Sequence, residues 1–244
     1  MAVVPTFREV DTVEACVERI VHAAQTVAVI VSDCHSDDGT REAAARAGAI
    51  VVQGEGASCR AHAINAGVDA AIDRFATAPA AARAIWIVHA DSIPPSDAGE
   101  RILETIKHEG KVGGAFAFRF ETAGQPMNIR LRLRLVEMIN RLRYRITGIY
   151  FGDQGIFFRA SAWRRVRPLP DWALMEDAEL SRRLQRLGKL VLLPREIKTS
   201  PRRFLHHGPI AQLTIDVVLI VLHGLGVNPR RLARMYRWYN RRKG

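Results

Sequence analysis

The stretch IWIVHADSIPP (residues 85–95) joins a buried strand to a group of polar side chains. Its apolar residues 85–88 are followed by His89 and Asp91, and two prolines then stop the strand. In open α/β sheets, functional side chains gather at the carboxyl ends of strands. An aspartate after a strand is also a common turn or helix cap, and on this segment alone the cap is the favoured interpretation.

A second strand end of this kind lies earlier, in VAVIVSDCHSDDGT (residues 27–40). Five apolar residues in a row predict a strand buried on both faces, and the polar cluster after them leads into the helical pattern REAAARAG. One interpretation of the cluster is a helix N-terminus, with Asp37 or Asp38 near the positive end of the dipole. The other gives Asp33, at the strand end, a base or a ribose to bind.

A third segment, residues 54–71, carries Arg60 and Asn65 on an otherwise alanine-rich helical pattern. A helix surface can carry both without a function. An arginine in the first turn is, however, well placed to face a phosphate group.

Strands and helices alternate up to about residue 110, which predicts an α/β fold with a mainly parallel sheet flanked by helices. Strands are predicted near 2–4, 27–32, 49–52, 84–88, 113–120, 155–158 and 190–193. Helices are predicted near 11–23, 39–47, 59–73, 97–108, 127–146, 160–165 and 176–187.

Seven segments in this order resemble the family 2 glycosyltransferases of the GT-A, Rossmann-like fold. They are PTFREVDTV (5–13), VSDCHSDDGT (31–40), CRAHAINAGV (59–68), IVHADSIPP (87–95), FGDQGIFFR (151–159), MEDAELSRRLQRLGK (175–189) and TSPRR (199–203). The resemblance covers about residues 3–203 and is greatest to a short bacterial branch described as arsenosugar-biosynthesis-type glycosyltransferases. It implies inverting transfer of a sugar from a nucleotide-diphosphate donor, with UDP-sugar favoured, to a small-molecule or lipid-linked hydroxyl.

The resemblance also implies roles for individual residues. Asp177 is expected to be the catalytic base, and Glu176 to orient the acceptor. Asp91 is expected to hold Mg²⁺ or Mn²⁺, with His89 beside it either as a weak ligand or supporting donor or, as is more usual, as a structural histidine. Asp153 and Gln154 belong to the acceptor side. The expected donor contacts are Pro5, Glu9, Asp33, Arg60, Asn65, Asp91, Arg202 and Arg203.

Three positions depart from the family pattern. Arg8 stands where an asparagine is usual, and Ala63 replaces a common glutamine. His89-Ala90-Asp91 replaces the usual Asp-x-Asp, which leaves one carboxylate rather than two for the metal and the donor diphosphate.

Two other functions remain open. A nucleotidyltransferase shares the nucleotide-binding design, but it would normally show a glycine-rich loop after the first strand, and PTFREVDTV has no glycine. The incomplete metal motif is also compatible with a non-catalytic nucleotide-sugar binder or a membrane-associated scaffold. Adjacent carboxylates at 176 and 177 could serve the helix dipole alone.

Composition sets further expectations. The 244 residues fit a glycosyltransferase domain, 1–205, and a C-terminal part, 206–244. Three scattered cysteines predict neither a disulfide framework nor a zinc site. The sequence starts directly with a strand and shows no N-terminal signal, which favours the cytoplasm.

The net charge of +11 is concentrated in residues 130–145 and 230–243. Few aromatic residues and no nucleic-acid motif accompany these arginines, so we expect no nucleic acid as partner and favour association with an anionic membrane, on its inner face. Residues 210–225 predict an amphipathic helix in the membrane interface or, equally, a buried helix, followed by a basic tail. The oligomeric state is not predicted.

Overall fold

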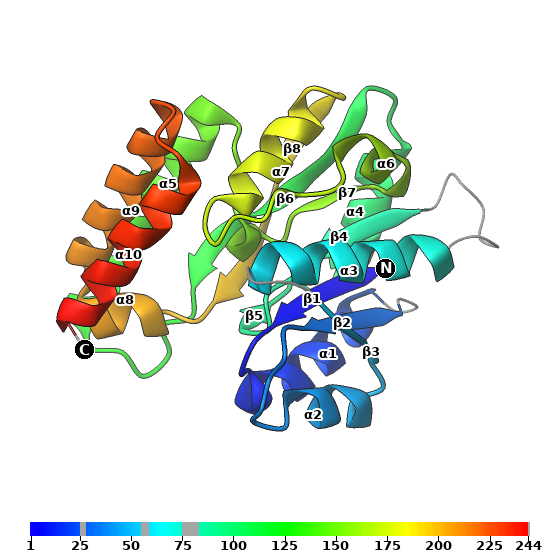
Figure 1. Cartoon of the computed structure of the whole chain (residues 1–244), viewed down its shortest axis with the longest axis horizontal. Helices are drawn as coiled ribbons and strands as arrows, with labels where there is room; N and C mark the ends of the chain where they lie inside the picture. The colour runs from blue at the N-terminus through cyan, green and yellow to red at the C-terminus, as the bar shows by residue number, and fades with distance from the viewer. Residues whose placement is uncertain (25–27, 55–58, 75–82, 244) are drawn as a thin grey trace.

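The computed structural model describes residues 1–24, 28–54, 59–74 and 83–243. These residues form one eight-stranded sheet with helices on both faces (Figure 1). The strands are β1 (Ala2–Thr6), β2 (Val29–Asp33), β3 (Ile50–Gln53), β4 (Ala84–Ile87), β5 (Ser92–Ile93), β6 (Lys111–Phe120), β7 (Phe157–Arg159) and β8 (Lys189–Thr199). The predicted α/β class with a mainly parallel sheet is confirmed.

The sheet has the order β3-β2-β1-β4-β7-β6-β8-β5. Strands β3, β2, β1 and β4 run parallel, as do β6 and β8, and β7 lies antiparallel between β4 and β6. The carboxyl ends of β1, β4, β6 and β8 therefore supply the residues around one cleft.

Successive side chains of the central strands point to opposite faces of the sheet, and each face is covered by its own layer of helices. Val4 of β1 and Val31 of β2 pack on α1 (Val10–Ala24), α2 (Thr40–Arg46) and α4 (Ala98–Lys107). Val3 and Ile30, pointing the other way, pack on α3 (Cys59–Arg74), α6 (Trp163–Val166) and α7 (Glu176–Gln185). Gly67 lets α3 approach the sheet, because a Cβ there would lie 2.5 Å from Val3 Cγ1.

The remaining helices stand together at one side of the sheet (Figure 1). They are α5 (Met127–Thr147), α8 (Arg202–His207), α9 (Pro209–Gly224) and α10 (Pro229–Lys243). Their inner side chains form two small cores, one with Phe118 and Phe120 of β6 and one with Met175 and Ala178 at the start of α7. Within the described residues, no helix combines the length and the apolar character needed to cross a bilayer.

Most predicted elements are present, with differences at their ends and after residue 188. The predicted strand at 190–193 is the start of the longer β8, and β5, a two-residue strand, was not predicted. Residues 230–243, described above as a basic tail, belong to helix α10, in which Leu232 is fully buried. The start of the strand predicted from residue 27 lies outside the described residues.

Candidate active site

A cavity of about 560 Å³ opens where the carboxyl ends of β1, β4, β6 and β8 meet helices α8, α9 and α10. Carboxylates reach it from the strand ends and from the start of α7, and Asp153 and Asp216 add two more. Ten of the predicted site residues line it: Pro5, Glu9, Arg60, His89, Asp91, Asp153, Glu176, Asp177, Arg202 and Arg203. Segments more than 190 residues apart in the sequence thus share one wall.

Asp91 lies just after β4, and its side chain is mostly buried. Oδ1 is 3.4 Å from the Thr199 hydroxyl at the end of β8, and Oδ2 is 3.8 Å from Nε of Arg202. The same arginine donates through Nη2 to Oε1 of Glu9. Glu9 also accepts a 2.9 Å hydrogen bond from the Thr12 hydroxyl, so these contacts join the loops after β1, β4 and β8.

The residues around Asp91 fit a hard divalent cation only as part of a larger ligand set. Among the described residues, no cluster of three or more His, Cys, Asp or Glu side chains could hold a metal ion. Mg²⁺ and Mn²⁺ commonly take one or two protein carboxylates and complete their shell with substrate phosphates and water. Asp91 offers such a carboxylate on the cavity wall, and its contacts to Thr199 and Arg202 are long.

His89 lies on the same wall, and its Nε2 has no hydrogen-bond partner among the described residues. Burial and the nearby charge of Arg60 lower the pKa of His89 to about 4, so the ring is neutral near pH 7. A Cβ on Gly152 would collide with this Nε2 and would lie 2.9 Å from Asp177 Oδ2. Nε2 therefore faces Gly152, next to the carboxylate of Asp177.

Two adjacent carboxylates begin helix α7, and both are almost fully buried. Oε1 of Glu176 accepts a 3.1 Å bond from Nη1 of Arg60, and Oδ2 of Asp177 accepts a 3.0 Å bond from the backbone N–H of Gly152. Oδ1 of Asp177 has no partner among the described residues. Asp177 thus has one oxygen fixed by the backbone and one buried oxygen without a hydrogen-bond partner among the described residues.

The environment of these acids favours their protonated forms. Burial, followed by the charge of Asp177, raises the pKa of Glu176 to about 7. Burial also raises the pKa of Asp177. Asp153, one residue after Gly152, has its pKa raised to about 6 by burial, although the charges of Arg143 and Arg203 oppose the shift. Groups that titrate near neutrality in a cavity are suited to proton transfer.

The structure adds cavity residues that the sequence did not single out. Asp216 of α9 pairs with Nη2 of Arg203 at 3.0 Å and accepts a 2.8 Å bond from Gln212. Arg143 of α5 donates to the Ile149 carbonyl and lies 4.4 Å above the Phe151 ring. A signal for the first was present in the sequence, because Asp216 is the sole acidic residue of an apolar helix.

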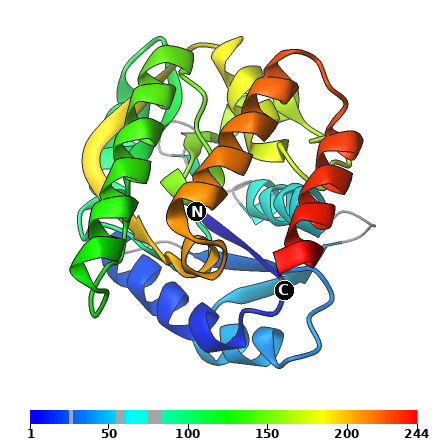
Figure 2. The ribbon, with the colours of Figure 1, turned by 90° about the vertical axis from the view of Figure 1, so that its left-hand side faces the viewer.

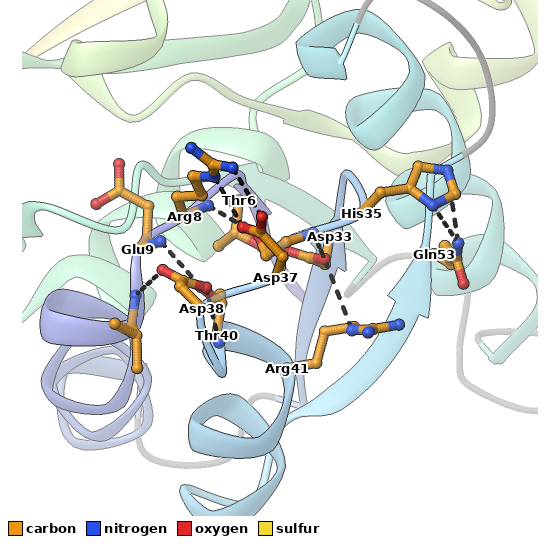
Figure 3. A network of polar contacts seen from close by, with 12 residues as sticks. Thr6, Arg8, Glu9, Asp33, His35, Asp37, Asp38, Thr40, Arg41 and Gln53 are labelled. Carbon is orange, nitrogen blue, oxygen red and sulfur yellow. Dashed lines mark hydrogen bonds and ion pairs between the residues drawn. The ribbon is translucent and has the colours of Figure 1, made fainter.

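Three predicted residues do not line the cavity. Asp33 is fully buried; Oδ1 accepts hydrogen bonds from the hydroxyls of Thr6 and Ser36, and Oδ2 accepts one from the Ser36 N–H (Figure 3). The side-chain amide of Asn65 donates to the Leu169 carbonyl and accepts from the Leu169 N–H. These contacts hold loops in place. Donor binding by Asp33 and Asn65 stays a prediction.

The third, Gln154, is buried. Its Oε1 accepts from the Phe151 N–H, and its Nε2 contacts the Phe116 carbonyl at 3.4 Å. It therefore shapes the turn that carries Gly152 and Asp153.

Arg8, at the position of the usual asparagine, points to Asp37 and forms two bonds of 2.8 and 2.7 Å with its carboxylate (Figure 3).

Several solved structures share this architecture at low sequence identity. Glucosyl-3-phosphoglycerate synthase from Mycobacterium tuberculosis, solved with Mn²⁺, uridine diphosphate and glucosyl-3-phosphoglycerate, has a TM-score of 0.59 at 16% identity, over 93% of this chain and 80% of that one. Mannosyl-3-phosphoglycerate synthase from Rubrobacter xylanophilus has a TM-score of 0.56 at 15% identity, over 92% and 74%. A mannosyltransferase from Pyrobaculum calidifontis, solved with GDP-Man and Mn²⁺, has a TM-score of 0.59 at 20% identity, over 88% of this chain and 61% of that one.

At these identities the structures establish a shared fold. No curated protein matches the sequence. The model of the glycosyl transferase family 2 matches residues 1–166, which is more than half of the chain and includes the strand ends that carry Glu9 and Asp91. The chain therefore belongs to glycosyl transferase family 2.

Proposed function

We propose that the protein is an inverting, metal-dependent glycosyltransferase that moves a sugar from a nucleotide-diphosphate donor to an acceptor hydroxyl. The observation that carries the proposal is the environment of the Asp177 carboxylate, which combines burial, one fixed oxygen and a raised pKa. Its side chain is buried at the cavity wall, Oδ2 is fixed by the Gly152 N–H, and Oδ1 is unpartnered among the described residues. A general base needs this combination of fixed position, free oxygen and raised pKa.

On the donor side, Asp91 would hold Mg²⁺ or Mn²⁺, with His89 as the candidate second ligand. Such an ion would neutralise charge that develops on the departing diphosphate. Arg202 and Arg203 add guanidinium groups on the same cavity, and their planar donor sets suit phosphate oxygens. Arg202 already bridges Glu9 and Asp91, so it can move its bonds to a diphosphate without leaving the site.

On the acceptor side, Asp177 would take the proton of the attacking hydroxyl. The acceptor oxygen then bonds to the anomeric carbon, and the electron pair of the carbon–oxygen bond to the diphosphate leaves with the nucleotide. Glu176, held by Arg60, would orient the acceptor. Attack from the face opposite the diphosphate inverts the anomeric centre, with no covalent enzyme intermediate. Asp153 stays a proposed acceptor contact, and Gln154 would act through the turn that it supports.

The donor is proposed to be a UDP-sugar. Two structural neighbours were solved with UDP or GDP-Man and with Mn²⁺, which supports a nucleotide-sugar donor and a divalent ion here. The preference for uracil rests on the resemblance of the sequence motifs. The cavity wall contains Phe151, Met175, Leu219 and Ile220 beside its charged groups, so the acceptor is proposed to be a small-molecule or lipid-linked hydroxyl with an apolar part.

The arsenosugar-type branch and the location in the cytoplasm, at the inner face of a membrane, stay predictions. Calorimetric titration of UDP and GDP, with and without Mn²⁺, tests the donor site. Hydrolysis or transfer of a UDP-sugar, followed by NMR of the anomeric configuration, tests the reaction. Metal-dependent UDP binding without any donor turnover would instead favour the non-catalytic binder, and retention of configuration would exclude the inverting mechanism.

A further inference from the structure

Helix α5 has two apolar faces, and only one of them is covered. Leu133, Val136 and Tyr144 point into the protein and are buried. A second row of apolar residues lies on the surface, with exposed fractions of 40–75%: Met127, Leu131, Leu135, Met138, Leu142 and Ile146. The spacing of four, four, three, four and four residues places the row within an arc of roughly 100° on the helix. It forms one continuous stripe along the helix.

Helix α9 continues this surface. Ile210, Val217, Val218 and Val221 are exposed along its outer side, and Leu225 follows at its end. Figure 2 shows α9 between α5 and α10, with the three helices side by side. On α10, Met235 and Trp238 are exposed as well. We call the outer surface of α5, α9 and α10 the helical wall.

The charges on the helical wall all have one sign. Arg132, Arg134 and Arg145 are exposed on α5, and Arg230, Arg231, Arg234 and Arg237 on α10. The sequences of the three helices contain two acidic residues. Glu137 is buried and binds the Phe120 N–H, while Asp216 is paired with Arg203 in the cavity. Neither faces outward to balance the arginines.

We propose that the helical wall docks on the surface of a bilayer that contains anionic lipids. An apolar stripe flanked by arginines is the pattern of helices that lie in the membrane interface, with apolar side chains among the acyl chains and cations at the headgroups. A second copy of the chain is a poorer occupant, because it would bring two sets of arginines together with no exposed carboxylate on the wall to pair with them.

The inner sides of the same helices line the candidate active site. Arg143 belongs to α5, Asp216, Leu219 and Ile220 belong to α9, and Tyr236 belongs to α10. One helix, about 10 Å thick, thus separates the cavity from the docking surface. If the proposed glycosyl transfer holds, this placement favours an acceptor whose hydroxyl is attached to a lipid. The docking itself does not depend on that reaction.

Flotation of the full chain with lipid vesicles tests the proposal. We expect binding to phosphatidylcholine vesicles that contain phosphatidylglycerol, little binding to phosphatidylcholine alone, and weakening by salt. The double variant Leu131→Glu/Leu142→Glu should lower the partition coefficient on the order of tenfold or more. The variant Arg134→Gln/Arg145→Gln should lower binding less and reduce its salt dependence.

Val21 on α1 and Leu103 on α4 are exposed apolar residues on other elements, so Val21→Glu/Leu103→Glu is the matched control and should bind as the unaltered protein does. The proposal is wrong if Leu131→Glu/Leu142→Glu binds anionic vesicles normally, or if binding is equal on neutral vesicles. It is also wrong if the unaltered chain binds no vesicle, and a dimer in light scattering that Leu142→Glu dissociates would then assign the wall to a second copy of the chain. Calorimetry of UDP on the same proteins reports the donor site separately.

Discussion

The backbone N–H of Gly152 donates to Oδ2 of Asp177 over 3.0 Å, and the same glycine leaves room for the imidazole of His89. Three segments that are distant in sequence therefore meet at one residue without a side chain. This contact fixes Oδ2 of Asp177, while Oδ1 has no hydrogen-bond partner among the described residues.

Gly152→Ala should disturb this junction. Its Cβ would collide with His89 Nε2 and crowd Asp177, so we expect donor turnover to fall at least about tenfold and stability to drop by about 1–3 kcal/mol. Activity assays and urea unfolding measure the two effects. Gly224→Ala is the control, because no atom of the described residues lies within 4 Å of its added Cβ. Wild-type turnover in Gly152→Ala would show that the site tolerates a shift of Asp177 or His89.

Asp177→Asn should leave donor binding intact and lower turnover on the order of 10²-fold or more, as expected for the loss of a general base. The amide keeps the shape of the carboxylate but does not take up a proton from the acceptor. Glu176→Gln should reduce turnover less, since its amide oxygen can still accept from Arg60. Calorimetry and initial rates separate binding from chemistry. Equal activity of Asp177→Asn and the unaltered protein would remove Asp177 from the mechanism.

Asp91→Ala should abolish the metal dependence of UDP binding, because the segment His89-Ala90-Asp91 after β4 contains no second carboxylate. Calorimetry with and without Mn²⁺ measures the effect. Glu104→Gln, an exposed acid on α4, is the control and should retain it. Metal-dependent binding of unchanged affinity in Asp91→Ala would place the ion elsewhere.

Sequence patterns predicted the sheet and most of its helices, and the resemblance to family 2 glycosyltransferases pointed to ten residues of the cavity wall. They performed well where buried apolar strands end abruptly, as before Asp91. The extent of β8 was missed because Arg195 and Lys198 interrupt its apolar pattern, and the strand is stabilised by pairing with β6 rather than by its own composition. Asp216 and Arg143 lie on helices whose approach to the cavity depends on long-range packing, which local spacing does not encode.

The raised pKa values of Glu176 and Asp153 predict how stability changes with pH. For both acids the folded-state pKa, about 7 and about 6, lies above the ordinary values of 4.5 and 3.8. The folded state therefore binds protons more strongly, and the stabilising contribution, complete below about pH 4, is lost as pH rises through 6 and 7. Glu176→Gln should accordingly be more stable, relative to the unaltered protein, at about pH 8 than at about pH 5.

The difference should be on the order of 1 kcal/mol or more, or about 2–4 °C in Tm, measured by thermal unfolding at both pH values. Asp37→Asn is the control, because the hydrogen bond from Arg8 holds the pKa of Asp37 below its ordinary value. That carboxylate is ionised at both pH values, so its replacement should change Tm by the same amount at each. If Glu176→Gln behaved like Asp37→Asn, Glu176 would be ionised throughout this range, and its pair with Arg60 would outweigh the cost of burial.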